Sequence, residues 1–366
     1  MKTPLAIKIP VRIGRATRLS SPGIAALCLA AGLVAPLPDG VNWNSRVQAC
    51  VTASTPAERI ADGLPDPENA ALLYWICWST GFDTFGDGSQ YQPEPDWKPS
   101  AEYAKTLTEN QGVIRQLLRA TRIRECDWGV EYSQGFGALM PHLGKLRAAT
   151  RVLAADSRRL AADGKVEDAA ERVAAIFRMA RHAAQDPVLI SSLVGLAIHN
   201  AGKAELEWLA TNGHLSDAGR KNIGDAVEQI PASDPFRFHD AIKMERDIAL
   251  EWIKKEFTGP AAGRRFLEQF AMPANDDDAA AAEVGKYNAE QLAEGVDMMR
   301  PAYDEAIAAW GKPDAVERLR AIEGRVNSGE FGPVAKLMFP ALNRSHEAYE
   351  RGIKDAMMVR EMVGAR

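Results

Sequence analysis

This sequence has few cysteines, no excess of basic charge and no long apolar run, and each of these absences excludes a class of protein. The 366 residues include 4 cysteines, and no two of them have the CxxC spacing of a structural zinc site or a thioredoxin-like centre. The apolar run at residues 23–35 is shorter than the roughly 20 residues that a membrane-spanning helix requires. No segment shows the sustained apolar–polar alternation of a half-buried strand, so we expect strands to be absent or minor.

The charge balance is not that of a nucleic-acid-binding protein. The formal net charge is −5 at pH 7, and beyond the N-terminal segment no part of the chain concentrates Lys and Arg. Binding to phosphates requires such a basic face. Apolar residues make up 46% of the chain and charged residues 25%, which is ordinary for a globular protein. We therefore expect a globular protein that does not bind nucleic acid.

The N-terminal segment has the form of an export signal. Residues 1–38 contain no acidic residue, and the apolar run at 23–35 follows the basic residues Lys2, Lys8, Arg12, Arg15 and Arg18. A basic stretch before about 7–15 apolar residues is typical of a secretory signal. We interpret residues 1–38 as a signal or N-terminal anchor, 39–66 as an extended lead-in and 67–366 as a helical domain, with a subdivision near 213–235.

This interpretation places the protein in the periplasm or cell envelope. An uncleaved segment would associate weakly with a membrane through residues 23–37, and a segment that is not a signal would leave the protein in the cytoplasm. Loss of Cys28 with the signal would leave Cys50, Cys77 and Cys126. In an exported protein Cys77 and Cys126 would be the pair to form a disulfide, whereas burial as small apolar side chains is the open alternative.

The clearest structural signal lies between Leu146 and Asn200. Two amphipathic helical patterns meet at Asp163–Gly164, and a third begins after Asp186–Pro187. Small alanines at the crossing and a glycine in the turn are typical of closely packed antiparallel helices. The second helix is similar to the second half of a tetratricopeptide hairpin, but the aromatic signature of the first half is missing. The sequence therefore predicts an all-α fold of stacked antiparallel helices, as a helical-repeat-like array or bundle.

Apolar periodicity predicts further helices on both sides of this hairpin. Their expected ranges are 68–80, 100–125, 187–211, 216–229, 235–257, 261–270, 276–310, 314–326 and 340–363. The helix at 235–257 carries Glu245, Asp247 and Glu251 among lysines and arginines. That mixture indicates an ion-paired face exposed to solvent.

Known catalytic and metal-binding motifs are incomplete or absent in the sequence. The loop from Asp83 to Glu94 matches several positions of a helix-loop-helix calcium site, but Phe85 replaces an oxygen ligand and prolines interrupt the exit helix. The six histidines lack the HExxH spacing of a zinc helix, and no nucleophile elbow or phosphate-binding glycine loop occurs. We expect no metal and no cofactor.

The best candidate for a specialised surface is the loop Cys126–Asp127–Trp128, together with His142 in the following Pro141–His142–Leu143. A tryptophan beside an acid and a glycine can line a groove, or it can close the end of a helical layer. His182 and His199 lie on successive predicted helices around the Asp186–Pro187 turn, close to Ser191. A lone histidine on such a helix is more often a satisfied core or surface residue than a functional one.

As a set, several of these segments resemble an uncharacterised family of exported, all-helical bacterial proteins. The resemblance rests on residues 69–75, 126–129, 141–147, the Asp163–Gly164 hairpin, 178–191 and 193–198, with weaker similarity at Glu245–Arg246 and 340–344. It implies a helical fold and export. The family has no assigned activity, so the resemblance implies nothing about a reaction.

The leading hypothesis for function is a non-enzymatic envelope protein that binds a protein or peptide partner through a helical groove. Stacked helix pairs form extended concave surfaces, and no catalytic motif competes with this interpretation. The alternative is an enzyme or small-molecule binder. Its pocket would be assembled from Cys126, Asp127, Trp128, His142, His182, Ser191 and His199. A third alternative is a purely structural role.

Overall fold

A computed structural model describes residues 67–270 and 279–365 of the chain. In these two ranges the structure consists of helices and loops without a β-strand, which confirms the predicted all-α fold class. One isolated bridge joins Asn69 to Glu125. The predicted signal at 1–38 and the lead-in at 39–66 lie outside the described residues. Among the described helices, none combines the length and apolar character needed to cross a membrane.

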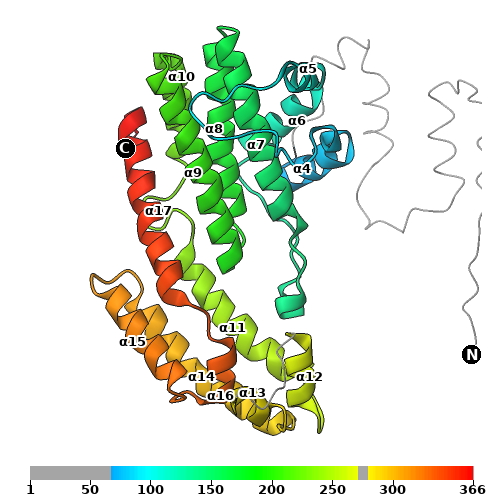
Figure 1. Ribbon diagram of the computed structural model, residues 1–366, viewed down its shortest axis with the longest axis vertical. Helices are drawn as coiled ribbons and strands as arrows, with labels where there is room; N and C mark the ends of the chain where they lie inside the picture. Colours follow the sequence, from blue (N-terminus) through cyan, green and yellow to red (C-terminus); the bar gives the residue numbers. More distant parts are fainter. Residues whose placement is uncertain (1–66, 271–278, 366) are drawn as a thin grey trace, which may run out of the picture. The chain divides into compact units, whose positions relative to one another are not determined.

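The centre of the fold consists of four consecutive helices that alternate in direction, with the second packed against each of the other three (Figure 1). They are α7 (Pro141–Ala162), α8 (Val166–Ala183), α9 (Leu189–Thr211) and α10 (Asp217–Val227). Gly164 forms the predicted turn between α7 and α8 with a φ of +74°, a conformation that glycine adopts without strain. Glycine also allows the close packing of α9 on α8. A Cβ added at Gly195 would lie 2.9 Å from the carbonyl oxygen of Ala180.

The chain before this stack forms a small group of helices beside α7 and α8. It comprises α4 (Ala70–Ser79), the 3-10 turn η1 (Phe82–Phe85), α5 (Ala101–Glu109) and α6 (Gln111–Arg122). The prediction of a single helix over residues 100–125 is wrong, because the chain turns at Asn110 between α5 and α6. The Asn110 side chain donates a hydrogen bond to the Thr106 carbonyl at 2.8 Å and so closes the end of α5.

The loop at residues 86–99 is fixed to the stack by a buried ion pair. Arg158 of α7 donates to Glu205 of α9 with an Nη2–Oε1 distance of 2.8 Å, and both side chains are almost fully buried. The same guanidinium donates to the Glu94 carbonyl, and Tyr91 donates its hydroxyl proton to Glu205. The Trp208 ring lies 4.9 Å from the Arg158 guanidinium carbon. The pair is thus surrounded by hydrogen-bond partners, as burial requires.

The C-terminal helices build a second core on the opposite side of α9. They are α11 (Phe238–Glu256), α12 (Ala262–Gln269), α13 (Ala279–Val284), α14 (Ala289–Ala309), α15 (Ala315–Asn327), α16 (Gly332–Met338) and α17 (Leu342–Val363). The long helix predicted at 276–310 is interrupted before Asn288, whose side chain caps α14. α16 was not predicted. α17 returns along α9 and α10, where Lys203 pairs with Asp355 at 2.7 Å.

Candidate binding site

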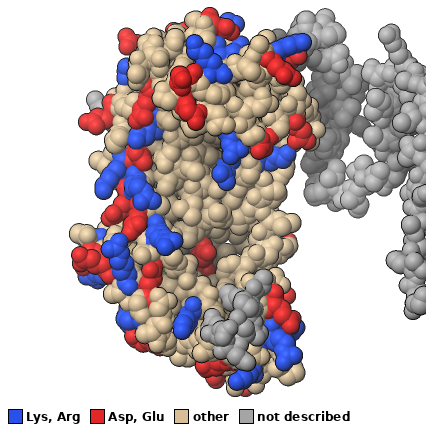
Figure 2. All heavy atoms as spheres, in the orientation of Figure 1, with Lys and Arg blue, Asp and Glu red and all other residues tan. Residues whose placement is uncertain are grey.

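An apolar groove lies between the long loop before α7 and the helices α9 and α11. It has a volume of about 560 Å³. Its lining comes from the loop and η2 (Tyr132–Gly137), from the first two turns of α7 and α9, and from the middle of α11. Figure 2 shows that charged side chains are sparse over the middle of this face, where the surface is hollowed. The lining residues are Tyr132, Gly135, Phe136, Ala138, Met140, Leu143, Gly144, Arg147, Val188, Ile190, Val194, Glu245 and Ile248.

Gly135 allows the loop to reach α11. Its φ is +54°, and a Cβ added there would lie 2.2 Å from the Cγ of Trp252 on α11. Only a residue without a side chain fits at this approach. The neighbouring Phe136 packs edge-on against Trp252 and Phe270, with ring centroids 5.7 Å and 5.4 Å away. The loop wall of the groove is therefore held against α11 by aromatic packing.

Large apolar side chains stand exposed at the groove and beside it. Ile190 is 52% exposed and Phe136 44% exposed, both in the lining, and Leu139 in the same loop is 83% exposed. Leu139 also lines a smaller hollow of about 260 Å³ with Trp75 of α4. On α4 the side chains of Leu72 and Ile76 are exposed as well. Exposed large apolar side chains around a hollow are often found at interaction surfaces.

Glu245 places a carboxyl group in the otherwise apolar groove. Its Oε2 accepts a hydrogen bond from the backbone N–H of Leu189, the first residue of α9, at 3.2 Å. Burial raises the pKa of Glu245 above its ordinary value. The sequence interpretation of this residue as part of an exposed ion-paired face is wrong. Its helix neighbours do form such pairs, for example Arg246 with Asp304 at 2.6 Å.

A buried carboxylate forms the wall behind the groove. Asp186, in the turn between α8 and α9, accepts a hydrogen bond from the Tyr132 hydroxyl at 2.7 Å. Its other oxygen lies 2.9 Å from Nε2 of His142 in the first turn of α7. Burial and the Asp186 carboxylate raise the pKa of Tyr132, which keeps its hydroxyl a donor. Asp186 thus ties the loop, α7 and the α8–α9 turn together.

Trp128 lies in a stack of aromatic rings beside this wall. Its ring stacks on His142 with a centroid distance of 4.5 Å and on Trp78 of α4 at 5.7 Å. Its indole N–H donates to the carbonyl oxygen of His182 at 3.3 Å. The indole is almost fully buried, at 7% exposure. This is the geometry of a side chain that closes the end of a helical layer, although one edge borders the smaller hollow.

His182 lies in the same cluster as a neutral buried imidazole. Its Nδ1 is 2.9 Å from the hydroxyl of Tyr74, and its Nε2 is 2.8 Å from the carbonyl oxygen of Ile123. Burial, together with the positive charge of Arg181, lowers the pKa of His182 to about 3. A neutral ring protonated at Nε2 satisfies both contacts, with Tyr74 as donor to Nδ1.

The sequence candidates fall into two groups in the structure. Cys126, Asp127, Trp128, His142 and His182 lie around the aromatic stack and Asp186. Ser191 and His199 do not join them. The Ser191 hydroxyl is buried against the Met140 sulfur at 4.0 Å, and His199 lies between the rings of Phe177 and Phe236. Burial lowers the pKa of His199 to about 4.

The two described cysteines are buried free thiols. Cys77 and Cys126 form no disulfide in this structure, which agrees with the alternative that they are small buried side chains. Burial raises the pKa of Cys77 to about 12, so its thiol stays protonated and unreactive.

Within residues 67–270 and 279–365, no group of three or more His, Cys, Asp or Glu side chains is placed to hold a metal ion. In the calcium-like loop, Asp83 pairs with Lys145 at 3.0 Å, and Asp87 accepts from the backbone N–H of Ser89.

Comparisons of the chain with protein-family models, curated proteins and solved structures found no match. The resemblance to a family of exported, all-helical bacterial proteins stays a prediction.

Proposed function

We propose that the apolar groove binds an apolar segment of a protein or peptide partner. The observation that carries this proposal is the exposure of Ile190 and Phe136 in the lining and of Leu139 beside it. Large apolar side chains are stabilised by leaving water, by about 25 cal/mol for each Å² buried. A partner that covers these three side chains gains this stabilisation, and the groove lined by Ile190 and Phe136 receives apolar side chains of the partner.

The groove also specifies a polar feature of the partner. Glu245 has one oxygen engaged by the Leu189 N–H and lies among apolar lining residues. A buried carboxyl group is stabilised by a hydrogen-bond donor or a cation. We therefore expect the bound segment to place an N–H donor or a Lys or Arg side chain next to its apolar anchor.

Selection from a displayed peptide library, followed by fluorescence anisotropy of the selected peptides, tests the proposal. We expect peptides with two or more large apolar side chains and a nearby basic residue. Ile190→Asp places a charge in the groove and should weaken binding about tenfold or more, because a charge buried against apolar groups is poorly solvated. Met357→Asp is the matched control, since Met357 is 61% exposed on α17 and does not line the groove.

Two results would contradict peptide binding in the apolar groove. One is the absence of any peptide enriched on the wild-type protein. The other is equal weakening of the selected peptides by Ile190→Asp and Met357→Asp, which would point to a general effect of the added charge.

We infer that the chain works in the periplasm or cell envelope. The support for this location is the basic and then apolar character of residues 1–38. Mass spectrometry of the protein from its host reads the mature N-terminus. A start within or after residues 30–53 supports export, and a chain that begins at Met1 contradicts a cleaved signal.

A further inference from the structure

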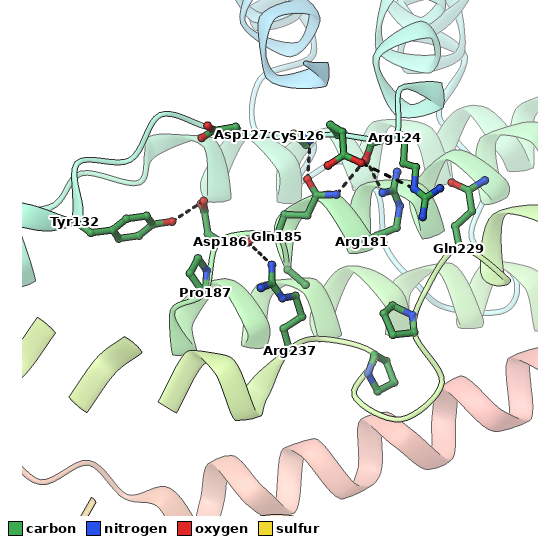
Figure 3. A pocket seen from close by; sticks show the side chains of 14 residues that line it. Arg124, Cys126, Asp127, Tyr132, Arg181, Gln185, Asp186, Pro187, Gln229 and Arg237 are labelled. Atoms are coloured by element: carbon green, nitrogen blue, oxygen red, sulfur yellow. Dashed lines mark hydrogen bonds and ion pairs between the residues drawn. The ribbon is translucent and has the colours of Figure 1, made fainter. Parts of the chain in front are cut away.

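A polar pocket lies on the other side of Tyr132 and Asp186 from the apolar groove. Its volume is about 500 Å³ (Figure 3). Two segments build most of it: the loop that follows α6, and the last turn of α8 with the turn between α8 and α9. The loop between α10 and α11 closes it. The lining residues are Arg124, Glu125, Cys126, Asp127, Tyr132, Arg181, Ala184, Gln185, Asp186, Pro187, Gln229, Pro231, Pro235 and Arg237.

Arg181 differs from the other buried arginines of the fold. The other three each form an ion pair with a carboxylate. Arg158 pairs with Glu205 at 2.8 Å, Arg172 with Asp156 at 2.9 Å, and Arg178 with Glu171 at 3.2 Å. Arg181 is 8% exposed, yet among the described residues no carboxylate pairs with it.

The contacts of Arg181 leave part of its guanidinium unsatisfied. Nη1 donates to the carbonyl oxygen of Arg124. Nη2 donates to the carbonyl oxygen of Ile123 at 3.3 Å and lies 2.9 Å from Nε2 of His182. Within the described residues the buried Nε has no hydrogen-bond partner. A buried guanidinium without a counter-ion is costly, and an anion beside it relieves that cost.

Acidic and basic side chains are unevenly distributed along the polar pocket. In Figure 3, Asp127, Tyr132 and Asp186 lie toward one end, whereas Arg124, Arg181 and Gln229 lie toward the other. One oxygen of Asp186 accepts a hydrogen bond from Tyr132, and the other lies 2.9 Å from Nε2 of His142 without forming a hydrogen bond among the described residues. Asp127 accepts from the backbone N–H of Gly129 at 2.9 Å. Asp127 and Asp186 thus lie away from Arg181. Glu125 also lines the pocket and attracts Arg181 electrostatically, but among the described residues its ion pair is with Arg124, at 3.9 Å.

Arg237 adds a second cation to the lining. Its Nη1 donates to the carbonyl oxygen of Gln185 at 2.9 Å, and its side chain also contacts Asp240 at 3.2 Å. Its backbone has a φ of +56°. Such a conformation is uncommon for a residue with a side chain and is often found at functional sites.

We propose that the polar pocket binds a small molecule through an oxyanion, a carboxylate or phosphate group that Arg181 receives with help from Arg237 or Arg124. Planar arginine donors bind both groups by paired hydrogen bonds. This site is separate from the apolar groove and does not depend on the proposed peptide binding.

Isothermal titration calorimetry with inorganic phosphate and with acetate, at constant ionic strength, tests the oxyanion site. We expect saturable binding of at least one of the two probes by the full chain, and their relative affinities distinguish phosphate from carboxylate as the preferred group. Chloride at the same ionic strength should give no saturable heat. Absence of saturable binding for both probes overturns the proposal.

Arg181→Gln should weaken binding by about tenfold or more, the loss expected for one hydrogen bond to a charged group. Arg181 also closes the end of α6, so its replacement could destabilise the fold. Arg237→Gln therefore serves as the second variant, and we expect it to lose less affinity than Arg181→Gln. Arg318→Gln is the matched control, an exposed arginine of α15 that does not line the pocket. Equal affinity in the Arg181→Gln, Arg237→Gln and Arg318→Gln proteins, each shown to be folded by circular dichroism, would overturn the assignment.

Discussion

Replacing Glu205 with Gln should cost this protein a large part of its stability. The substitution keeps the shape of the side chain and removes its charge. In the fold, Glu205 is completely buried and accepts three contacts from Arg158, at 2.8, 2.9 and 3.2 Å, and one hydrogen bond from Tyr91. A neutral amide at this position would leave the buried guanidinium of Arg158 without a counter-charge.

The expected magnitude follows from these contacts. Removing one partner of a buried ion pair typically costs about 3–5 kcal/mol. Two features favour the lower end. The substitution opens no cavity, and Arg158 keeps its hydrogen bond to the Glu94 carbonyl and its contact with the Trp208 ring. We therefore expect a loss of about 3 kcal/mol, or a fall in the unfolding midpoint of about 6 °C at roughly 2 °C per kcal/mol.

Urea unfolding followed by tryptophan fluorescence measures this loss, because Trp97 and Trp208 lie beside Arg158. Asp314→Asn is the control. It breaks an exposed pair with Arg318, at a similar distance of 2.7 Å, and should leave the unfolding midpoint nearly unchanged because solvent screens this pair. Equal losses in Glu205→Gln and Asp314→Asn would refute the reasoning that burial makes this pair indispensable.

Three further predictions concern pH and the groove. Burial raises the pKa of Glu245, so the stability that this group contributes below its unfolded pKa of about 4.3 is lost as pH rises through the raised pKa. In urea unfolding, the free energy of unfolding of Glu245→Gln should therefore increase relative to that of the wild type as pH rises. A difference that stays constant with pH would contradict this. Since burial lowers the pKa of His182 to about 3 and of His199 to about 4, stability should fall as pH drops from about 6.5 toward those values. His199→Leu should flatten part of that acid slope, and an unchanged slope would exclude His199 as its source. Gly135→Ala should cost about 1–3 kcal/mol in thermal unfolding and weaken the selected peptides, whereas Gly137→Ala, which has open space, should change neither.

Local sequence signals were sufficient for much of the helical stack. The apolar spacing around Asp163–Gly164 predicted the α7–α8 hairpin, because a helix packed on both neighbours must repeat its apolar residues every three to four positions. The apolar spacing did not predict helix ends where a single residue ends a helix inside a longer amphipathic pattern. Asn110 and Asn288 are such residues, since each closes or caps a helix through its own side chain.

The candidate site was predicted less well, because its key features depend on contacts between distant segments. Cys126–Trp128, His142 and His182 do come together. The exposure of Ile190 could not be predicted, since an apolar residue in a helical pattern looks the same whether another helix covers it or not. Glu245 looked like its paired neighbours, and only the packing of α9 against α11 partly buries it.

Photo-crosslinking at the groove tests the central proposal most directly. A benzophenone amino acid replaces Phe136 in one variant and Met357 in another, and each is irradiated with a selected peptide. The account predicts a crosslinked product from position 136, with the peptide attached through its apolar segment, and no comparable product from position 357. Equal crosslinking at both positions, or crosslinking at 357 alone, would contradict binding in the apolar groove.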